Sequence, residues 1–196
     1  MKNKRMGKTP EVEQLKRELT RVNYRSRFKK VLRSTIYTLI VVSAVAVLTA
    51  VLFLPVLRIY GSSMTPTLQE GDVVISIKGI SIQQGDVVGV YWGSKLLIKR
   101  CIATEYQWIT IDDDGNVYID GDLLEEPYIT EKALGECNIK MPYQVPENSI
   151  FVMGDHRATS IDSRNSSVGC FDLDDVVGKI VFRLWPIKGF GFIKSY

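Results

Sequence analysis

The chain has 196 residues, enough for one domain of ordinary size and an appendage. Hydrophobic residues make up 45% of it and charged residues 24%, a composition that excludes a mostly disordered chain. One His and three Cys leave no plausible Cys/His zinc cluster, and no Gly-rich phosphate loop is present. We therefore expect no metal and no other cofactor.

The net charge of +3 averages two opposite parts. Residues 1–34 hold twelve Lys/Arg and three Glu, whereas residues 35–196 hold 13 basic and 19 acidic residues. Residues 34–57 are 24 consecutive uncharged residues. As a helix they would reach about 36 Å, enough to cross a hydrocarbon core of about 30 Å. This predicts a transmembrane helix over 34–57 rather than a buried core helix, which normally shows a polar face.

The charges on either side of this span predict its orientation. A basic flank before the span and an acidic segment after it place the N-terminus in the cytoplasm. The expected domains are a basic, partly helical cytoplasmic arm over 1–33, the span over 34–57 and an extracytoplasmic domain over 58–196. Thr9-Pro10-Glu11 has the form of a helix start in the arm. A cleaved signal peptide is the alternative, but the basic region is long for one.

Residues 58–196 have the pattern of short strands and turns. Two Gly-Asp-Val-Val turns begin at Gly71 and Gly85, and no long amphipathic helical period is present. We predict an all-β domain. Its remaining strands are expected at 95–102, Trp108–Ile111 and Val117–Ile119 as a hairpin, Ser149–Met153, and 176–182. Trp185, Phe190 and Phe192 in the tail fit either a membrane interface or a closing strand.

Three motifs carry the chemistry: Tyr60-Gly61-Ser62-Ser63-Met64-Thr65-Pro66-Thr67-Leu68, Leu97-Ile98-Lys99-Arg100 and Gly154-Asp155-His156-Arg157-Ala158-Thr159-Ser160-Ile161-Asp162-Ser163-Arg164. In this order they resemble type I signal peptidases, membrane-anchored serine proteases with a Ser-Lys dyad that remove secretory signal peptides. The match covers nearly all of 59–185 and is closest to the Gram-positive, single-span kind. The resemblance implies a mainly β, signal-peptidase/LexA-like catalytic domain behind one N-terminal transmembrane helix.

By this resemblance Ser63 is the nucleophile and Lys99 the general base. A lysine base must be neutral, so its pKa must fall roughly 2 to 3 units from about 10.4. Three apolar residues precede Lys99, and strand alternation places it on an apolar inward face. The resemblance also makes the Ser63 backbone N–H an oxyanion donor. The second donor is unassigned, because the position that carries a Ser in some members is Gly61 here.

The third motif is predicted to support the dyad. The resemblance implies that Ser160 hydrogen-bonds the amine of Lys99, and that Asp155, Asp162, Arg100 and Arg164 form ion pairs around the site. A solvated loop is the alternative for these residues. His156 is an alternative general base, although in relatives that use His it replaces the Lys.

The resemblance therefore implies signal peptidase I activity, that of an endopeptidase of the cell membrane. Its partners would be the lipid bilayer and secretory preproteins with small residues, of the Ala-x-Ala type, before the cut. Nucleic acid is not expected, because the basic arm is explained by topology and anionic lipid. The alternative is a dedicated or non-catalytic relative that assists processing or assembly of surface proteins such as pilins. The odd number of cysteines, Cys101, Cys137 and Cys170, argues against a disulfide scaffold.

Overall fold

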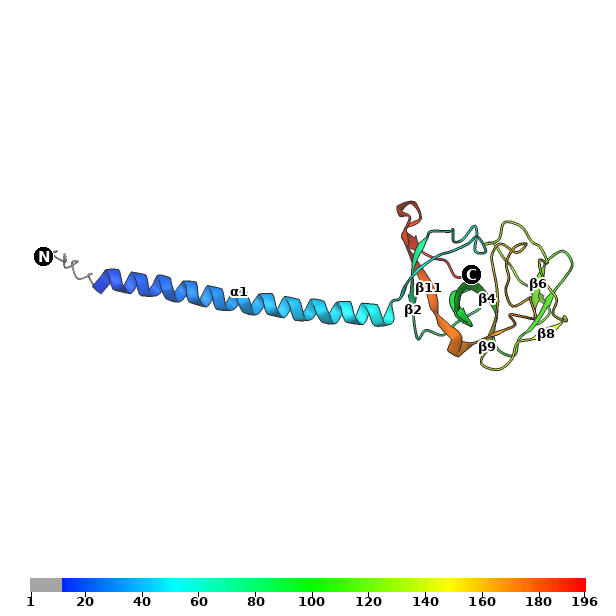
Figure 1. Ribbon diagram of the computed structural model, residues 1–196, viewed down its shortest axis with the longest axis horizontal. Coiled ribbons are helices and arrows are strands. Elements are labelled where there is room, and N and C mark those ends of the chain that lie inside the picture. Colours follow the sequence, from blue (N-terminus) through cyan, green and yellow to red (C-terminus); the bar gives the residue numbers. More distant parts are fainter. Residues whose placement is uncertain (1–11) are drawn as a thin grey trace. The chain divides into compact units, whose positions relative to one another are not determined.

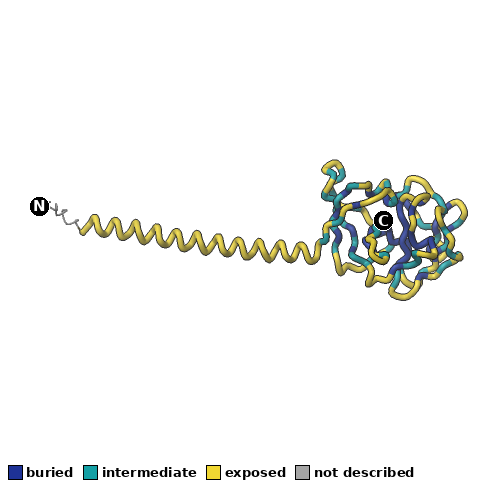
Figure 2. Tube along the Cα trace, in the orientation of Figure 1, coloured by how far each residue is buried: buried dark blue, intermediate teal, exposed yellow. Residues whose placement is uncertain are grey.

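The computed structural model of the chain describes residues 12–196. Its N-terminal element is one continuous helix, α1 (Val12–Phe53), of 42 residues (Figure 1). All of α1 is exposed (Figure 2), and its most apolar window of 18 residues has a mean hydropathy of 2.6. The helix start predicted at Thr9-Pro10-Glu11 lies outside the described residues. The chain divides into two compact units, Met1–Ala50 and Val51–Tyr196.

Helix α1 ends four residues before the uncharged stretch does. Pro55 explains the end, because proline has no N–H to donate and disfavours helical dihedrals in the residue before it. The next residues form the strand β1 (Val56–Arg58), which pairs with β2 (Val73–Ile77). The apolar character of the chain therefore continues past the helix into the first strand of the domain.

The domain consists of two antiparallel sheets, which confirms the prediction of a mainly β fold. The larger sheet has the order β1-β2-β11-β3-β4-β9-β10, with β12 paired to β11, and the smaller has the order β7-β6-β5-β8. The remaining strands are β3 (Val87–Trp92), β4 (Lys95–Ala103), β5 (Trp108–Ile111), β6 (Val117–Ile119), β7 (Asp122–Leu123), β8 (Tyr143–Gln144), β9 (Ser149–Met153), β10 (Phe171–Asp172), β11 (Val176–Trp185) and β12 (Gly191–Phe192).

The two Gly-Asp-Val-Val motifs form the same local structure before β2 and β3. Gly71 and Gly85 have φ of 90° and 87°, the left-handed region that favours glycine. The carboxylates of Asp72 and Asp86 each accept a hydrogen bond from the backbone N–H three residues earlier, at 3.1 Å and 3.0 Å. Each turn thus satisfies its own backbone and directs the following β-branched residues into a strand.

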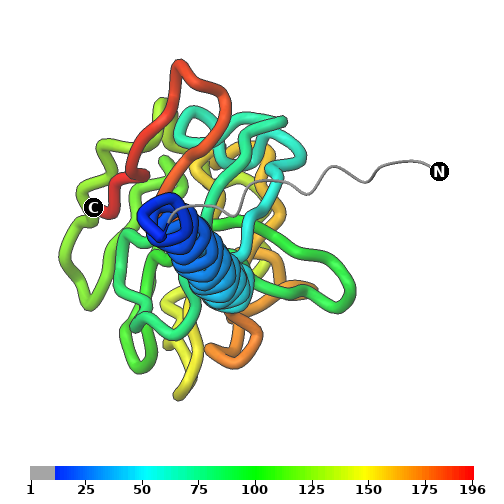
Figure 3. Tube along the Cα trace, turned by 90° about the vertical axis from the view of Figure 1, so that its left-hand side faces the viewer, coloured from blue at the N-terminus to red at the C-terminus, as the bar shows by residue number. Residues whose placement is uncertain are grey.

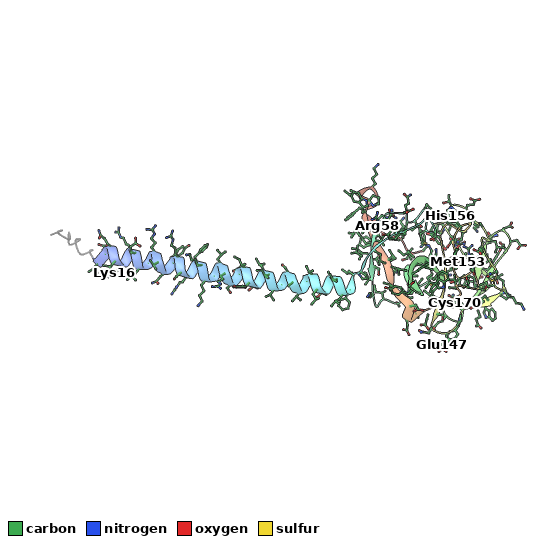
Figure 4. All side chains as sticks on the ribbon, in the orientation of Figure 1. Lys16, Arg58, Glu147, Met153, His156 and Cys170 are labelled. Atoms are coloured by element: carbon green, nitrogen blue, oxygen red, sulfur yellow. The ribbon has the colours of Figure 1, made fainter. Side chains whose placement is uncertain are left out.

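A shared core joins the two sheets. It is formed by β4 and β9 from the larger sheet and β5 and β6 from the smaller one, and its buried members are Ile102, Ala103, Ile109, Ile111, Val117, Ile119, Val145, Phe151 and Met153. Met153 lies inside the domain and Glu147 at its edge (Figure 4). From Lys99 to Ala103 every residue of β4 is buried, so polar side chains here must find partners within the protein.

The C-terminal tail forms a hairpin. Strand β11 extends to Trp185, three residues past the predicted 176–182, and β12 returns along it. The turn between them holds a short 3₁₀ helix, η2 (Ile187–Gly189). This hairpin, orange to red in Figure 3, carries Trp185, Phe190 and Phe192 at exposed positions. A closing strand is thus present, and contact of these side chains with lipid stays a prediction.

Candidate active site

Ser63 and Lys99, 36 residues apart in sequence, meet in the domain. The Lys99 Nζ lies 2.7 Å from the Ser63 Oγ, a hydrogen-bonding distance. Lys99 is in the middle of β4, where Val88 of β3 is its partner in the ladder. Ser63 lies in the turn that follows β1, and the buried side chains of Met64 and Leu68 anchor that turn to the core.

The environment of Lys99 favours its neutral amine. The residue is only 3% exposed. Burial lowers the pKa of Lys99 to about 8, against a rise caused by the nearby charge of Asp162 and a further fall caused by Arg164. The charge of Asp155 raises this pKa as well. A substantial fraction of the amine is therefore unprotonated near pH 8, as a general base requires.

Arg100, the next residue on β4, is fully buried and forms an ion pair. Its Nε and Nη2 donate to the two carboxylate oxygens of Asp155 at 2.9 Å and 2.7 Å. A third donor, Nη1, reaches the Gly85 carbonyl at 2.7 Å, and the guanidinium lies 3.9 Å from the centre of the Tyr128 ring. Thr67 donates to the same carboxylate. The pair fixes the start of the 154–164 loop against β4.

A second buried pair lies at the other end of that loop. Arg164 donates through Nε and Nη2 to the two oxygens of Asp162, at 2.8 Å and 2.9 Å. Burial alone would raise the pKa of Asp162, but the hydrogen bonds and charge of Arg164 hold it below its usual range. The Asp162 carboxylate also accepts the Gly154 N–H at 2.9 Å. These contacts tie the loop to the end of β9.

The site residues belong to a stretch that matches one family model. The model described as signal peptidase, peptidase S26, matches residues 32–185. The chain belongs to this signal peptidase family. Its relatives include signal peptidase I of Bacillus licheniformis, 34% identical over 71% of this chain and 80% of the relative. Signal peptidase I of Streptococcus pneumoniae serotype 4 is 29% identical over 84% of this chain and 98% of the relative.

Two further similar proteins are a sequence relative and a solved structure. Signal peptidase I T of Bacillus subtilis is 32% identical over 70% of this chain and 76% of the relative. Among solved structures, a signal peptidase I of Enterococcus faecalis V583 has a TM-score of 0.42 and 25% identity, covering 51% of this chain and 97% of that one.

One predicted contact of this signal peptidase family member is not observed. Ser160 was expected to hydrogen-bond the amine of Lys99, but its buried Oγ has no hydrogen-bond partner within the described residues. The amine bonds Ser63 instead. Ser160 packs against Gly154, on which an added Cβ would lie 2.3 Å from the Ser160 Oγ and 2.5 Å from the Ser63 carbonyl oxygen. Ser160 therefore lines the site without bonding the dyad.

His156, the alternative general base, and Gly61, at the position that carries a second oxyanion donor in some relatives, have different surroundings. The exposed imidazole of His156 (Figure 4) has its Nδ1 2.7 Å from the Thr159 Oγ1, while its backbone N–H donates to the Ser63 carbonyl at 3.0 Å. The contacts of His156 thus hold the Ser63 turn through the backbone. Gly61 has φ of 79°, with no atom within 4 Å of an added Cβ. Space exists there for a side chain, but the backbone favours glycine.

Sequence reasoning missed a third buried ion pair. Arg157 donates to both carboxylate oxygens of Glu126, with Nη1 3.2 Å from Oε2, and its Nε donates to the Gly154 carbonyl at 3.2 Å. Arg157 lies inside the third motif, but nothing in the sequence pairs it with Glu126. No group of three or more His, Cys, Asp or Glu side chains with metal-binding geometry occurs among residues 12–196.

Proposed function

We propose that the chain is a signal peptidase I that removes N-terminal signal peptides from secreted preproteins, with Ser63 as nucleophile and Lys99 as general base. Membership of the signal peptidase family supports the reaction class. The observation that supports these two roles is the 2.7 Å contact between the Lys99 amine and the Ser63 hydroxyl. The amine is buried and its pKa is lowered to about 8, so it can take a proton near neutral pH.

The reaction follows from these two groups. Neutral Lys99 takes the hydroxyl proton as Ser63 Oγ attacks the peptide carbonyl and forms a tetrahedral intermediate. The resulting ammonium then gives its proton to the departing amine of the mature protein, leaving an acyl-enzyme. Lys99 next takes a proton from water, whose oxygen attacks the ester, and returns that proton to Ser63 as the signal peptide leaves.

The surrounding residues have positioning and electrostatic roles. The Ser63 backbone N–H is proposed as one donor to the oxyanion, and no second donor is assigned. The Arg100–Asp155 and Arg164–Asp162 pairs fix the loop that packs beside the dyad. The net charge of these pairs is zero. This balance leaves burial as the main influence on the Lys99 amine.

Placement in the membrane is part of the proposal. One apolar helix and the family make this a membrane-anchored enzyme. Because α1 ends at Phe53 and β1 belongs to the domain, we assign residues 34–53 of the predicted 34–57 stretch to the span. Residues 1–33 are then a cytoplasmic arm and residues 54–196 lie on the outer side, because twelve of the 25 basic residues lie in 1–34. Preproteins with Ala-x-Ala before the cut would then meet Ser63 just beyond the outer membrane surface.

The test is cleavage of a preprotein with an Ala-x-Ala junction by the full chain in detergent or lipid. We expect one cut after the second Ala, read by N-terminal sequencing of the product. Ser63→Ala and Lys99→Ala should abolish it. Lys99→Arg should be equally inactive, because a guanidinium stays charged. Ser62→Ala, the adjacent hydroxyl, is the matched control.

Each outcome has a distinct reading. Cleavage retained in folded Ser63→Ala would refute the nucleophile assignment. Loss of activity in folded His156→Ala equal to that in Lys99→Ala would refute Lys99 as the general base. No cleavage by the folded parent of a panel of preproteins, pilins included, would favour a non-catalytic role in surface-protein assembly, whereas cleavage of pilins alone would indicate a dedicated enzyme.

A further inference from the structure

The dyad opens onto a groove between two unpaired strand edges. The groove, of about 660 Å³, is lined by residues 56–61, 63, 64 and 95–99, and contains both Ser63 and Lys99. Among residues 12–196, strand β1 pairs only with β2, so no described strand covers its other edge. Strand β9 pairs with β4 only from Arg100 onward, so Lys95 to Lys99 also have an edge that no described strand covers. An extended peptide can add its main chain to such edges.

The charge of this groove is opposite to that of the domain around it. Residues 35–196 hold 19 acidic and 13 basic residues, yet the groove lining contains Arg58, Lys95 and Lys99 and no Asp or Glu. Arg58 (Figure 4) and Lys95 are both exposed. Because Lys99 is buried, Arg58 and Lys95 are the exposed cations that a peptide in the groove meets.

Aromatic rings hold both of these cations without neutralising them. The Arg58 guanidinium lies 5.9 Å from the centre of the Tyr60 ring, and the Lys95 amine lies 5.8 Å from the Trp92 ring. Neither side chain forms a salt bridge with any residue in 12–196. Both charges are therefore available to a carboxylate on a bound peptide.

The spacing along β4 places this charge relative to the cut. Lys95 precedes Lys99 by four residues on the strand, a rise of about 13 Å at roughly 3.3 Å per residue. A peptide extended along this edge, with its scissile carbonyl at Ser63, would have its fourth residue from the cut beside Lys95. The same peptide would pass Arg58, five residues before Ser63 on the opposite wall.

We infer that Arg58 and Lys95 are specificity-determining residues, selecting preproteins with an acidic side chain about four residues from the cut and rejecting those with a basic one. This inference rests on the proposed function. Main-chain pairing with the strand edges does not distinguish charged side chains of the substrate. Arg58 and Lys95 would add a preference for acidic ones. An exposed ion pair has a modest effect, so we expect Asp at this position to raise kcat/KM roughly two- to fivefold over Ala. Lys should lower kcat/KM by a similar factor.

The test uses peptides with one Ala-x-Ala junction and a single Asp, Ala or Lys placed three to six residues from the cut, on either side. The full chain is assayed in neutral detergent at low salt. The Asp-to-Lys ratio of kcat/KM should peak at one position on one side and fall as salt screens the charges. Lys95→Gln and Arg58→Gln should each move the ratio towards one, and Lys95→Glu should reduce or reverse it. Lys140→Gln, an exposed lysine outside the groove, should keep the parent ratio.

The possible outcomes distinguish failure of this inference from failure of the proposed signal peptidase function. A parent that cuts the Ala peptide but shows no charge preference leaves the function standing and refutes the inference. If no peptide is cut, binding of the Asp and Lys peptides to the Ser63→Ala chain decides the inference by itself. If the two Gln substitutions change activity only in vesicles with anionic lipid, and leave the detergent ratio unchanged, the cations face lipid and the inference is wrong.

Discussion

Lys99 is a polar, ionisable residue in a buried position, and burial disfavours the charged form of its amine. Within residues 12–196 its amine makes one side-chain hydrogen bond, to Ser63, and desolvation is the largest influence on its pKa. The two carboxylates whose charges raise this pKa, Asp162 and Asp155, are each bound by an arginine, so neither restores the ammonium fully. The catalytic property of this residue therefore follows from what surrounds it, and pH is the variable that reports on it.

The first prediction concerns the pH dependence of cleavage. The kcat/KM of the parent should rise with pH through an apparent pKa of about 8 and then level, since only the free enzyme with neutral Lys99 can accept the hydroxyl proton. At pH 7 the rate should be roughly a tenth of the plateau. The assay uses a peptide without titratable groups near the cut, so that ionisation of the substrate does not contribute to the pH profile. A flat profile between pH 6.5 and 9.5 would refute the lysine base.

The second prediction concerns stability at the same residue. The pKa of Lys99 is about 8 in the folded chain against a usual 10.5, so the unfolded chain binds more protons between these values and folding gains stability as pH rises from 8 to 10.5. Lys99→Met removes the protonatable group and should be the more stable protein at pH 7, with an advantage of up to about 3 kcal/mol. Most of that advantage should be gone at pH 10.

Thermal unfolding of the full chain in detergent measures this difference in stability as a gap in Tm between the parent and Lys99→Met. Lys95→Met, an exposed lysine of the same strand, is the matched control and should show a smaller gap at pH 7, because loss of an exposed lysine relieves no burial cost. A Lys99→Met chain that is less stable than the parent at pH 7 would contradict a burial cost at Lys99.

At the scale of the element, the end of β9 positions the dyad through a glycine. Gly154 follows β9 and gives its N–H to Asp162 and its carbonyl to Arg157. A Cβ there would approach the Ser160 Oγ and the Ser63 carbonyl oxygen within 2.5 Å. These distances are below any normal contact, so a side chain at 154 must displace the Ser63 turn or Ser160.

The third prediction compares Gly154, which follows β9, with Gly89 in β3. Gly154→Ala should lower kcat/KM by more than tenfold, because displacement of a reacting atom by about 1 Å costs on the order of a hundredfold in rate. Gly89→Ala in β3 should retain most activity, because its Cβ would meet side chains at an ordinary 3.6 Å. Both glycines lie outside the left-handed region, so backbone strain does not separate them. Equal activity in the two folded variants would refute this positioning role.

The strands show how far sequence alone reaches. Alternation and turn residues predicted β5, β6 and β9 with their observed bounds, because each has enough β-branched and aromatic residues to give a signal. Strands of two residues, such as β7 and β8, carry no period and were not predicted. The contact between Ser63 and Lys99 was expected from family motifs, whereas the unpartnered Oγ of Ser160 depends on packing around Gly154, which no local pattern reports.

At the scale of the whole domain, the 154–164 loop joins the two sheets through two buried ion pairs and a hydrogen bond. Asp155 binds Arg100 of the larger sheet. Arg157 binds Glu126, in the segment between β7 and β8 of the smaller sheet. Arg164 adds a hydrogen bond of 2.7 Å to the Leu134 carbonyl in that same segment. The site is therefore supported from both sheets, and loss of a contact with the smaller sheet should be felt at Ser63.

The fourth prediction follows from the Arg157–Glu126 pair. Arg157→Met leaves the buried Glu126 carboxylate without its cation, and should cost about 3 to 5 kcal/mol of stability. The double variant Arg157→Met/Glu126→Leu removes both charges and should recover much of that loss, because neither partner then stays buried and unpaired. Lys179→Gln breaks a pair with Asp86 whose lysine side chain is 22% exposed, and should cost less than Arg157→Met.

Activity and Tm together distinguish a structural pair from one that also positions the site. The Nε of Arg157 donates to the Gly154 carbonyl, a bond that the double variant also loses. Its Tm should therefore recover further than its kcat/KM, since the Gly154 backbone beside Ser63 and Ser160 stays less constrained. Recovery of both to the parent level would show that Arg157 acts on stability alone, and recovery of neither would show that the charge pair itself stabilises the joined sheets.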